Sequence, residues 1–461
     1  METQSACEIA DGVRTRRLSA REAVEAALKR LDERNPALNA FVTVDAEGAR
    51  AHAARIDEAI ARGEDSGPLA GVPIGVKDLE PVAGLRYTSG SRAYADRIAT
   101  EDSVQVARLK AAGAIVIGKT NTPEFGYKGF TENRLFGATT NPWDHTKTSG
   151  GSSGGSASAV AGGIVALCTG SDGGGSIRIP SALCGCYGIK PTAGANAPTW
   201  GTHSTVGPIA GTVRDAARYM DVAAGPHPND LDSLDAPAGG YEAAAIGPRP
   251  RLRRIGWSAD FGYAAVEPEV ARLARAAAER LAAAVGAELV EADPGFDNPM
   301  AAWYSIAAPG DCVLVDSMTD EQRAVLEPGF AAFTEQARGL TGAQVAAGLE
   351  TRHQLNRTMT EYFTRYDLLL SPTTSITAFA AAGPPPTNIG GREGGPAAFI
   401  PFTPPFNMTG HPGASLPAGN AANGLPVGVQ VIAPRFADAL VLAVSAAYEA
   451  ASPWKYPAWN G

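Results

Sequence analysis

The sequence predicts an α/β protein whose sheet contains parallel pairs of strands. Segments with helical periodicity alternate with short apolar runs, which is the pattern of helices that connect parallel strands. The runs at 72–76 and 114–118 are continuously apolar, as in strands that are buried. The 461 residues exceed the usual size of one domain, but a single large α/β sheet can reach this length.

The first half of the chain gives the clearest helix signals. Ser19 lies three residues before Glu22 and opens an apolar repeat of 3.6 residues, which is a capping box at the start of a helix that should end near Asn35 and Pro36. The strand at 72–76 ends at Lys77, so this lysine follows an apolar segment directly. The other elements expected here are helices over 46–61 and 102–112 and a strand over 114–118.

The second half repeats the alternation after a Pro-, Gly- and Asp-rich segment at 226–250, which is expected to be a surface connection. A half-buried strand is predicted over 427–432, where valines alternate, and an irregular mobile loop over 383–395. The remaining expectations are strands over 254–257, 287–291 and 366–372, and helices ending at 223 and covering 268–285, most of 318–365 and 437–450.

Composition excludes several classes of function. There are 39 basic and 48 acidic residues, giving a net charge of -9, and no basic run, so nucleic acid is not an expected ligand. The five cysteines are scattered and odd in number, which is typical of a reducing compartment. No stretch is apolar enough for a signal peptide or a membrane span, so we expect a cytoplasmic protein without a membrane partner.

Two glycine-framed serine clusters, at 150–156 and 173–176, dominate the chemistry-bearing part of the sequence. Glycine permits backbone conformations that present a side chain rather than pack it, so these serines are candidate nucleophiles. A flexible linker is the common alternative, but an apolar run joins the two clusters directly. A nucleotide P-loop would require Gly-Lys-Ser or Gly-Lys-Thr after the glycines, and this is absent.

Other catalytic arrangements fit less well. The letters of a nucleophile elbow occur at 150–154, but the preceding polar segment 144–148 is not a buried strand. None of the six histidines falls in a recognisable serine–histidine pattern, and Cys184 and Cys186 lack a second ligand pair at zinc spacing. What remains is a serine with a lysine as its base.

The sequence resembles the amidase signature family. The resemblance is carried by 150–158, by Ser-Asp-Gly-Gly-Gly-Ser-Ile-Arg-Ile-Pro at 171–180, by Gly-Ile-Lys-Pro-Thr at 188–192 and by the block 71–78 around Lys77. It extends to segments near both ends of the chain. It implies a large mixed, twisted β-sheet with helices on both faces, formed by one domain over 1–461. The signature core would cover about 65–215, and about 250–461 would complete the sheet and the substrate pocket.

Carried over position by position, the resemblance implies a Ser-cisSer-Lys triad in a hydrolase that works through an acyl-enzyme. Ser176 would be the nucleophile, Ser152 a bridging serine after a cis peptide, and Lys77 the base. Burial can lower the pKa of a lysine from about 10.4 by several units, which would let it accept a proton near neutral pH. The implied oxyanion hole consists of backbone N–H groups, and the supporting residues brace them. The oxyanion residues are Gly173, Gly174, Gly175 and Ser176; the supporting residues are Ser153, Asp172 and Arg178.

The scheme needs no cofactor and no metal. Aromatic residues at candidate pocket positions favour a neutral, fairly hydrophobic small-molecule substrate: an amide, aryl amide, ester or carbamate (urethane). The candidate pocket residues are Phe125, Tyr127, Trp303, Phe402 and Phe406. We expect a stand-alone hydrolase. The alternative is a glutamine-hydrolysing subunit of a tRNA-dependent amidotransferase, which belongs to the same family. Homodimers are common in the family, so a homodimer is left open.

Overall fold

A mixed β-sheet of 11 strands crosses the protein and takes strands from both halves of the chain. In the computed structural model, which describes residues 4–197 and 203–459, the strand order is β1-β3-β2-β8-β10-β9-β16-β17-β13-β11-β12. The strands are β1 (Phe41–Val44), β2 (Pro73–Lys77), β3 (Ile115–Thr120), β8 (Leu167–Asp172), β9 (Tyr187–Lys190), β10 (Thr205–Ala210), β11 (Arg254–Trp257), β12 (Glu288–Glu291), β13 (Leu368–Pro372), β16 (Gly413–Asn420) and β17 (Pro426–Ile432).

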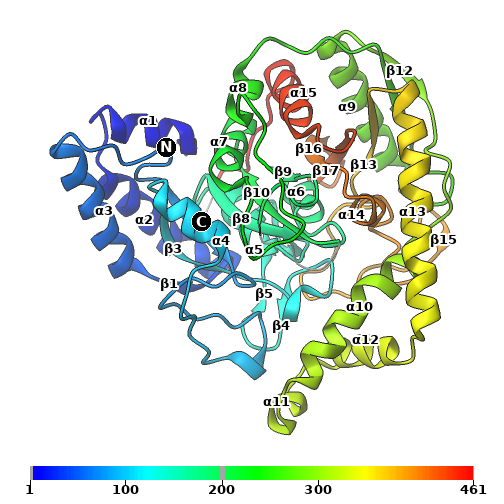
Figure 1. Cartoon of the computed structure of the whole chain (residues 1–461), viewed down its shortest axis with the longest axis horizontal. Helices are drawn as coiled ribbons and strands as arrows, with labels where there is room; N and C mark the ends of the chain where they lie inside the picture. The colour runs from blue at the N-terminus through cyan, green and yellow to red at the C-terminus, as the bar shows by residue number, and fades with distance from the viewer. Residues whose placement is uncertain (1–3, 198–202, 460–461) are drawn as a thin grey trace.

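Helices surround this sheet (Figure 1). In the view of Figure 1, α1 to α3 lie at one end of the molecule, and α10 to α13 form an arm at the other end. The helices are α1 (Ala6–Arg14), α2 (Ala20–Leu38), α3 (Ala46–Ala61), α4 (Val104–Ala111), α5 (Gly154–Ala161), α6 (Arg178–Cys184), α7 (Val213–Ala223), α8 (Tyr241–Ile246), α9 (Pro268–Val285), α10 (Met300–Asp316), α11 (Asp320–Ala324), α12 (Pro328–Arg338), α13 (Gly342–Arg365), α14 (Pro404–Met408) and α15 (Asp438–Ala451).

The predicted parallel pairs are present: β2 pairs in parallel with β3 and β8, and β11 with β12 and β13. The capping box at Ser19 is also present, because the Glu22 N–H donates to Ser19 Oγ at 3.1 Å and the Ser19 N–H donates to the Glu22 carboxylate at 2.8 Å. The helix continues past Pro36 and ends at Asn39, whose φ of 47° is incompatible with another helical turn. The fold class that the sequence predicts is therefore confirmed.

Strand β17 corrects one expectation, because it is buried on both faces rather than on one. Val429 and Val431 belong to the main hydrophobic core together with α9 and α15. On the opposite face, Gly428 lies so close to α6 that an added Cβ would approach the Ala182 side chain to 2.6 Å. Because successive side chains of a strand point to opposite faces, helices must cover both sides of the sheet here.

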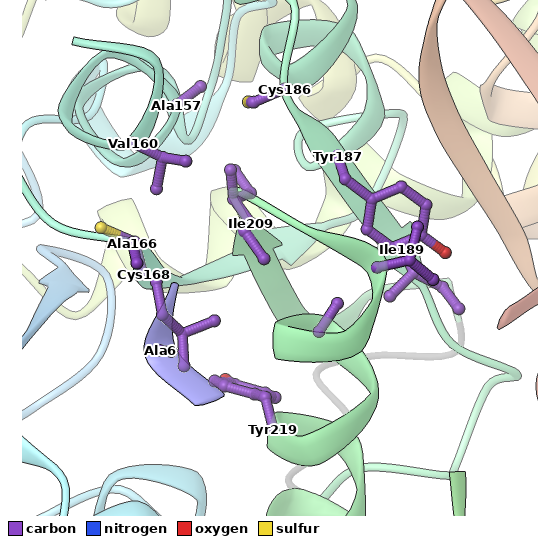
Figure 2. Packing of buried hydrophobic residues seen from close by; sticks show 14 of the residues in the cluster. Ala6, Ala157, Val160, Ala166, Cys168, Cys186, Tyr187, Ile189, Ile209 and Tyr219 are labelled. Atoms are coloured by element: carbon purple, nitrogen blue, oxygen red, sulfur yellow. The ribbon is translucent and has the colours of Figure 1, made fainter. Parts of the chain in front are cut away.

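The main core lies between this sheet and its helices. Figure 2 shows Ala157 and Val160 of α5, Cys168 of β8 and Ile209 of β10 beside one another in that core. Small residues of α5 allow the helix to pack closely: an added Cβ at Gly155 would lie 2.3 Å from the Asn121 backbone nitrogen. This close packing fixes α5, and with it the serine cluster from which the helix begins.

Two segments differ from the sequence-based expectation. The supposed connection at 226–250 contains α8, whose Tyr241 is buried in the core. The loop at 383–395 contains a short hairpin, β14 (Asn388–Ile389) and β15 (Arg392–Glu393), anchored by the buried Ile389. The polar segment at 144–148 is not a buried strand, as expected: it forms β7 (Asp144–Thr148), which is mostly not buried and pairs with β6 (Thr140–Asn141) outside the main sheet. A separate small pair is β4 (Glu132–Asn133) with β5 (Gly137–Ala138).

Two buried charged residues lie at the ends of neighbouring strands. Lys77 is the last residue of β2 and Asp172 is the last residue of β8, and these strands are parallel neighbours. The carboxyl ends of parallel strands meet at one edge of a sheet, which is where α/β proteins commonly build their sites. Within 4–197 and 203–459, no helix has the length and apolar character that crossing a bilayer requires.

Candidate active site

Lys77 is fully buried at the end of β2, and its side-chain nitrogen has two hydroxyl partners. Nζ lies 2.7 Å from Ser152 Oγ and 3.0 Å from Ser171 Oγ. Burial lowers the pKa of Lys77 to about 7, although the charges of Glu80 and Asp172 act in the opposite direction. A lysine in this position can exist as a neutral amine near neutral pH.

Ser152 connects the lysine to the first glycine-rich cluster. The Gly151–Ser152 peptide bond is cis, as the resemblance implies. Gly151 is also held close to a neighbouring segment, since an added Cβ would lie 2.8 Å from the backbone of Phe130. Ser152 immediately precedes Ser153, the residue that caps the start of α5. The Ser152 hydroxyl is therefore held by a fixed backbone on one side and by Lys77 on the other.

Ser176 and Ser152 line the same cavity. The second glycine-rich cluster, 173–176, follows directly after the end of β8. The two hydroxyls do not hydrogen bond to each other in this structure. Ser153 joins the clusters, because its N–H donates to the Ser176 carbonyl at 3.2 Å and its hydroxyl donates to the Ser171 carbonyl at 3.3 Å. Catalytic hydrogen bonds are often long without substrate, so a cavity shared by both serines is compatible with proton transfer between them.

Asp172 and Arg178 form a fully buried ion pair around the loop that carries Ser176. Arg178 Nη2 lies 2.8 Å from Asp172 Oδ1, and Arg178 Nε lies 3.0 Å from Oδ2. Burial alone would raise the pKa of Asp172, but the charge and hydrogen bonds of Arg178 outweigh it and hold that pKa well below the ordinary range. Arg178 also donates to Gln430 Oε1 at 2.8 Å and to Asn407 Oδ1 at 2.7 Å, which ties the loop to β17 and α14.

Three side chains from the C-terminal half hold successive carbonyl groups of the same loop. Asn407 donates to the Asp172 carbonyl at 2.8 Å, Trp303 Nε1 to the Gly173 carbonyl at 2.8 Å, and Thr403 Oγ1 to the Gly174 carbonyl at 2.7 Å. In a trans peptide the N–H points opposite to the preceding C=O. Anchoring each carbonyl therefore orients the N–H of the following residue.

This arrangement corrects the predicted oxyanion hole at one position. The Gly175 N–H donates to Asp172 Oδ1 at 2.8 Å, so it is occupied in holding the loop. The N–H groups of Gly173, Gly174 and Ser176 have no acceptor among the described residues. An oxyanion site would therefore use these three donors, whereas Gly175 has a structural role. Its φ of 126° and an added Cβ at 2.2 Å from Thr403 Oγ1 explain why glycine occupies this position.

The cavity in front of the serines has a volume of about 330 Å³ and is bordered by segments distant in the sequence. Phe125, Tyr127 and Trp303 line it, as predicted from their aromatic character. Phe402 and Phe406 do not. Both are fully buried in an aromatic cluster, with ring centroids 5.0 Å and 6.0 Å from that of Phe261, so the pocket prediction for these two residues is wrong.

On one wall of this cavity, sequence reasoning identified Trp303 alone. Helix α10 was not predicted, yet Trp303, Ile306, Ala307, Gly310 and Asp311 all line the cavity. Their spacing of three and four residues is that of one helix face. The same spacing would have identified this face if the segment had been interpreted as a helix. Burial raises the pKa of Asp311 to about 7.

The described residues contain no group of three or more His, Cys, Asp or Glu side chains that could hold a metal ion. Cys184 and Cys186 are buried thiols, and burial raises the pKa of both, which keeps them protonated. The groups around Lys77 are hydroxyls and backbone N–H groups, and the cavity in front of them also contains Lys128, His203 and Asp311.

Comparison with known proteins places this geometry in context. The family described as Amidase matches residues 22–442. An acylamidase from Rhodococcus erythropolis is 40% identical over 466 aligned positions, which cover 98% of this chain and 96% of that protein. A glutamyl-tRNA(Gln) amidotransferase subunit from Synechococcus sp. (strain CC9605) is 37% identical, with 94% of each chain covered.

Solved structures give the same result. A bacterial aryl acylamidase of the amidase signature enzymes superimposes with a TM-score of 0.93 and 33% sequence identity, covering 98% of this chain and 97% of that chain. The likeness therefore extends over the whole sheet, including the C-terminal strands and α10.

We expect the Asp172→Asn substitution to destabilise the fold. It would leave the buried Arg178 guanidinium without its counter-charge, and the loss of one partner from a buried pair costs about 3–5 kcal/mol of unfolding free energy. Denaturant unfolding measures the change. The control is Glu25→Gln, which breaks the exposed pair with Arg50 and should cost less than about 1 kcal/mol. Equal effects of the two substitutions would contradict the bracing role of Asp172.

Proposed function

The chain belongs to the amidase signature family and is an amide hydrolase, and from this premise we propose that it is a stand-alone serine hydrolase that uses Lys77, Ser152 and Ser176. The observation that carries the proposal is the buried Lys77 amine, 2.7 Å from Ser152 Oγ at the edge of a cavity that Ser176 shares. The proposed reaction is cleavage of a C–N bond through an acyl-enzyme.

Lys77 is suited to act as a base because burial removes the charge that a lysine ordinarily carries. With a pKa of about 7, a substantial fraction is neutral at physiological pH, and a neutral amine has one lone pair to accept a proton. Ser152 and Ser171 are the side-chain hydrogen-bond partners of its Nζ among the described residues. Both serines line the cavity together with Ser176, and we take Ser152, which is closer to Nζ and follows the cis peptide, as the relay.

In the proposed mechanism, Ser176 Oγ attacks the substrate carbonyl carbon. Its proton moves to Ser152 Oγ, while the Ser152 proton moves to Lys77 Nζ. The tetrahedral oxyanion accepts hydrogen bonds from N–H groups of Gly173, Gly174 and Ser176. The proton then returns through Ser152 to the leaving nitrogen, the C–N bond breaks, and water attacks the acyl-enzyme by the same route to release the acid.

The lining of the cavity favours substrates whose groups next to the reacting carbonyl are apolar. Leu79, Phe125, Trp303, Ile306 and Ile400 contribute apolar surface to it. The family relatives include an acylamidase and an aryl acylamidase, which is in keeping with an aryl or alkyl amide. Esters and carbamates present the same carbonyl geometry to Ser176, so we include them as candidate substrates.

The amidotransferase alternative is favoured by the 37% identity to a glutamyl-tRNA(Gln) amidotransferase subunit. Free glutamine carries an α-carboxylate, which requires a cation to bind it. Among the described residues no arginine lines the cavity, and Lys128 is already paired with Glu132 at 2.7 Å and with Glu327 at 2.6 Å. Arg392 donates instead to the carbonyls of Ala264 and Tyr263 outside the cavity. These contacts support the stand-alone hydrolase.

Hydrolysis by the purified chain alone tests the choice. We expect turnover of aryl and alkyl amides and no release of ammonia from glutamine. The measurement is a panel of anilides, aliphatic amides, esters, carbamates and glutamine, with product detected by chromatography. Inactivity on this panel, together with glutamine hydrolysis that appears only after partner subunits are added, would establish the amidotransferase alternative instead.

Replacing the proposed nucleophile tests the mechanism separately. We expect Ser176→Ala to lower kcat by at least about a thousandfold, because no attacking hydroxyl remains. The same variant should lose covalent labelling by a fluorophosphonate, which intact-mass spectrometry detects as one added phosphonyl group. Ser317→Ala, at an exposed serine after α10, serves as the control and should behave like the parent. Retention of most activity by Ser176→Ala would refute the assignment.

The pH dependence follows from the lowered pKa of Lys77. Below about pH 7 the amine is protonated and cannot accept a proton, so kcat/KM should fall as the pH decreases and reach a plateau above about pH 8. Asp311 also titrates near pH 7, so the profile is repeated with Asp311→Asn and an uncharged anilide. The rising limb should persist in that variant. A flat profile between about pH 5.5 and 8.5 would argue against Lys77 as the base.

A further inference from the structure

Asp311 is the one carboxylate among the residues that line the cavity in the described part of the chain. It lies on the face of α10 that Trp303, Ile306, Ala307 and Gly310 also present to the cavity. Trp303 is at the other end of this face, where its indole donates to the Gly173 carbonyl beside the proposed oxyanion site. Eight residues of helix separate the two, a rise of roughly 12 Å.

The Asp311 carboxylate has no hydrogen bond and no ion pair with any described residue. Neighbouring acids on the same helix end differ: Asp316 is exposed and pairs with Arg338. Asp311 is half-buried, and this partial burial raises its pKa to about 7. Because the carboxylate lines the cavity and no described side chain pairs with it, it is available to a ligand there.

The charges around the cavity determine which kind of ligand group Asp311 can bind. Lys128 is the cation on the cavity wall, but Glu132 and Glu327 both hold it, at 2.7 Å and 2.6 Å. Asp172 is neutralised by Arg178, and Lys77 is a buried amine whose hydroxyl partners are Ser152 and Ser171. Lys128 contributes one positive charge here, whereas Glu132, Glu327 and Asp311 each contribute a negative charge, so negative charge is in excess. Together these groups repel a substrate carboxylate and attract a cation.

We propose that Asp311 is a specificity residue that accepts a hydrogen bond from a protonated amino group at the end of the substrate remote from the scissile amide. This inference rests on the proposed hydrolase function and refines it. The group next to the carbonyl is neutral and apolar, as expected from the sequence, but the far end carries an amine. The amine would replace the missing partner of the carboxylate and make a charge-assisted hydrogen bond.

The amino group can lie on the acyl side of the scissile amide or on its leaving-group side. The experiment therefore uses one matched pair of substrates for each side. On the acyl side, ω-aminooctanoyl anilide is compared with nonanoyl anilide. On the leaving-group side, para-aminobutyl acetanilide is compared with para-pentyl acetanilide. In each pair a methyl group replaces the amino group at equal chain length. Assays at about pH 8 keep Asp311 ionised and the aliphatic amines protonated.

We expect the parent to prefer the amine in at least one pair by about tenfold in kcat/KM. The isosteric Asp311→Asn variant should lose this preference through a higher KM, while its kcat/KM for the alkyl partner changes by less than about twofold. Asp316→Asn, on the same helix but outside the cavity, is the matched control and should keep the preference. An equal loss on both members of a pair would indicate a structural role and overturn the inference.

The other outcomes separate this inference from the proposed function. Turnover of the alkyl anilides without an amine preference in either pair would refute the role of Asp311 but leave the hydrolase intact. A second readout does not depend on turnover: calorimetric binding of octylamine to Ser176→Ala, with and without Asp311→Asn. We expect the second substitution to raise Kd by about tenfold, and an unchanged Kd would also overturn the inference.

Discussion

The buried pair between Asp172 and Arg178 is the interaction on which the centre of this protein depends. Two charges removed from water are costly to bury, and here nearly every lone pair and N–H of the pair has a partner. Asp172 accepts hydrogen bonds from the backbone N–H groups of Gly175 and Ile177 as well as from Arg178. The carboxylate thereby folds the loop around itself. Arg178 extends the same network to Gln430 of β17 and Asn407 of α14.

The sheet and α10 contribute different properties to the site. Lys77 and Asp172 end neighbouring parallel strands, so their positions follow from the register of the sheet. The cavity wall comes from α10, which touches the reactive loop through the Trp303 indole. Substitutions elsewhere on α10 would leave the groups at the strand ends in place, which is how one fold can serve many functions.

Much of the fold could be predicted from the sequence, because its signals are local, whereas the candidate site residues were assigned through the family resemblance. The helices at 46–61 and 268–285 lie where their periodicity indicates, and Lys77 follows an apolar strand directly. Contacts between segments that are distant in the chain have no local sequence pattern that predicts them. Nothing near Thr403 or Gln430 in the sequence indicates that they hold a loop more than 200 residues away, at Gly174 and Arg178. Phe402 was misplaced for the same reason: an aromatic residue fits a core cluster as readily as a pocket.

The dependence of the Ser176 loop on β17 has a consequence for how the protein folds as it is made. Ser176 is synthesised long before Gln430, and until β17 joins the sheet, Arg178 lacks its partners from the C-terminal half. Long-range pairing of this kind forms late in folding. A chain without its C-terminal half keeps the local pair of Asp172 and Arg178 but lacks the hydrogen bonds that Gln430, Asn407 and Thr403 contribute to this loop.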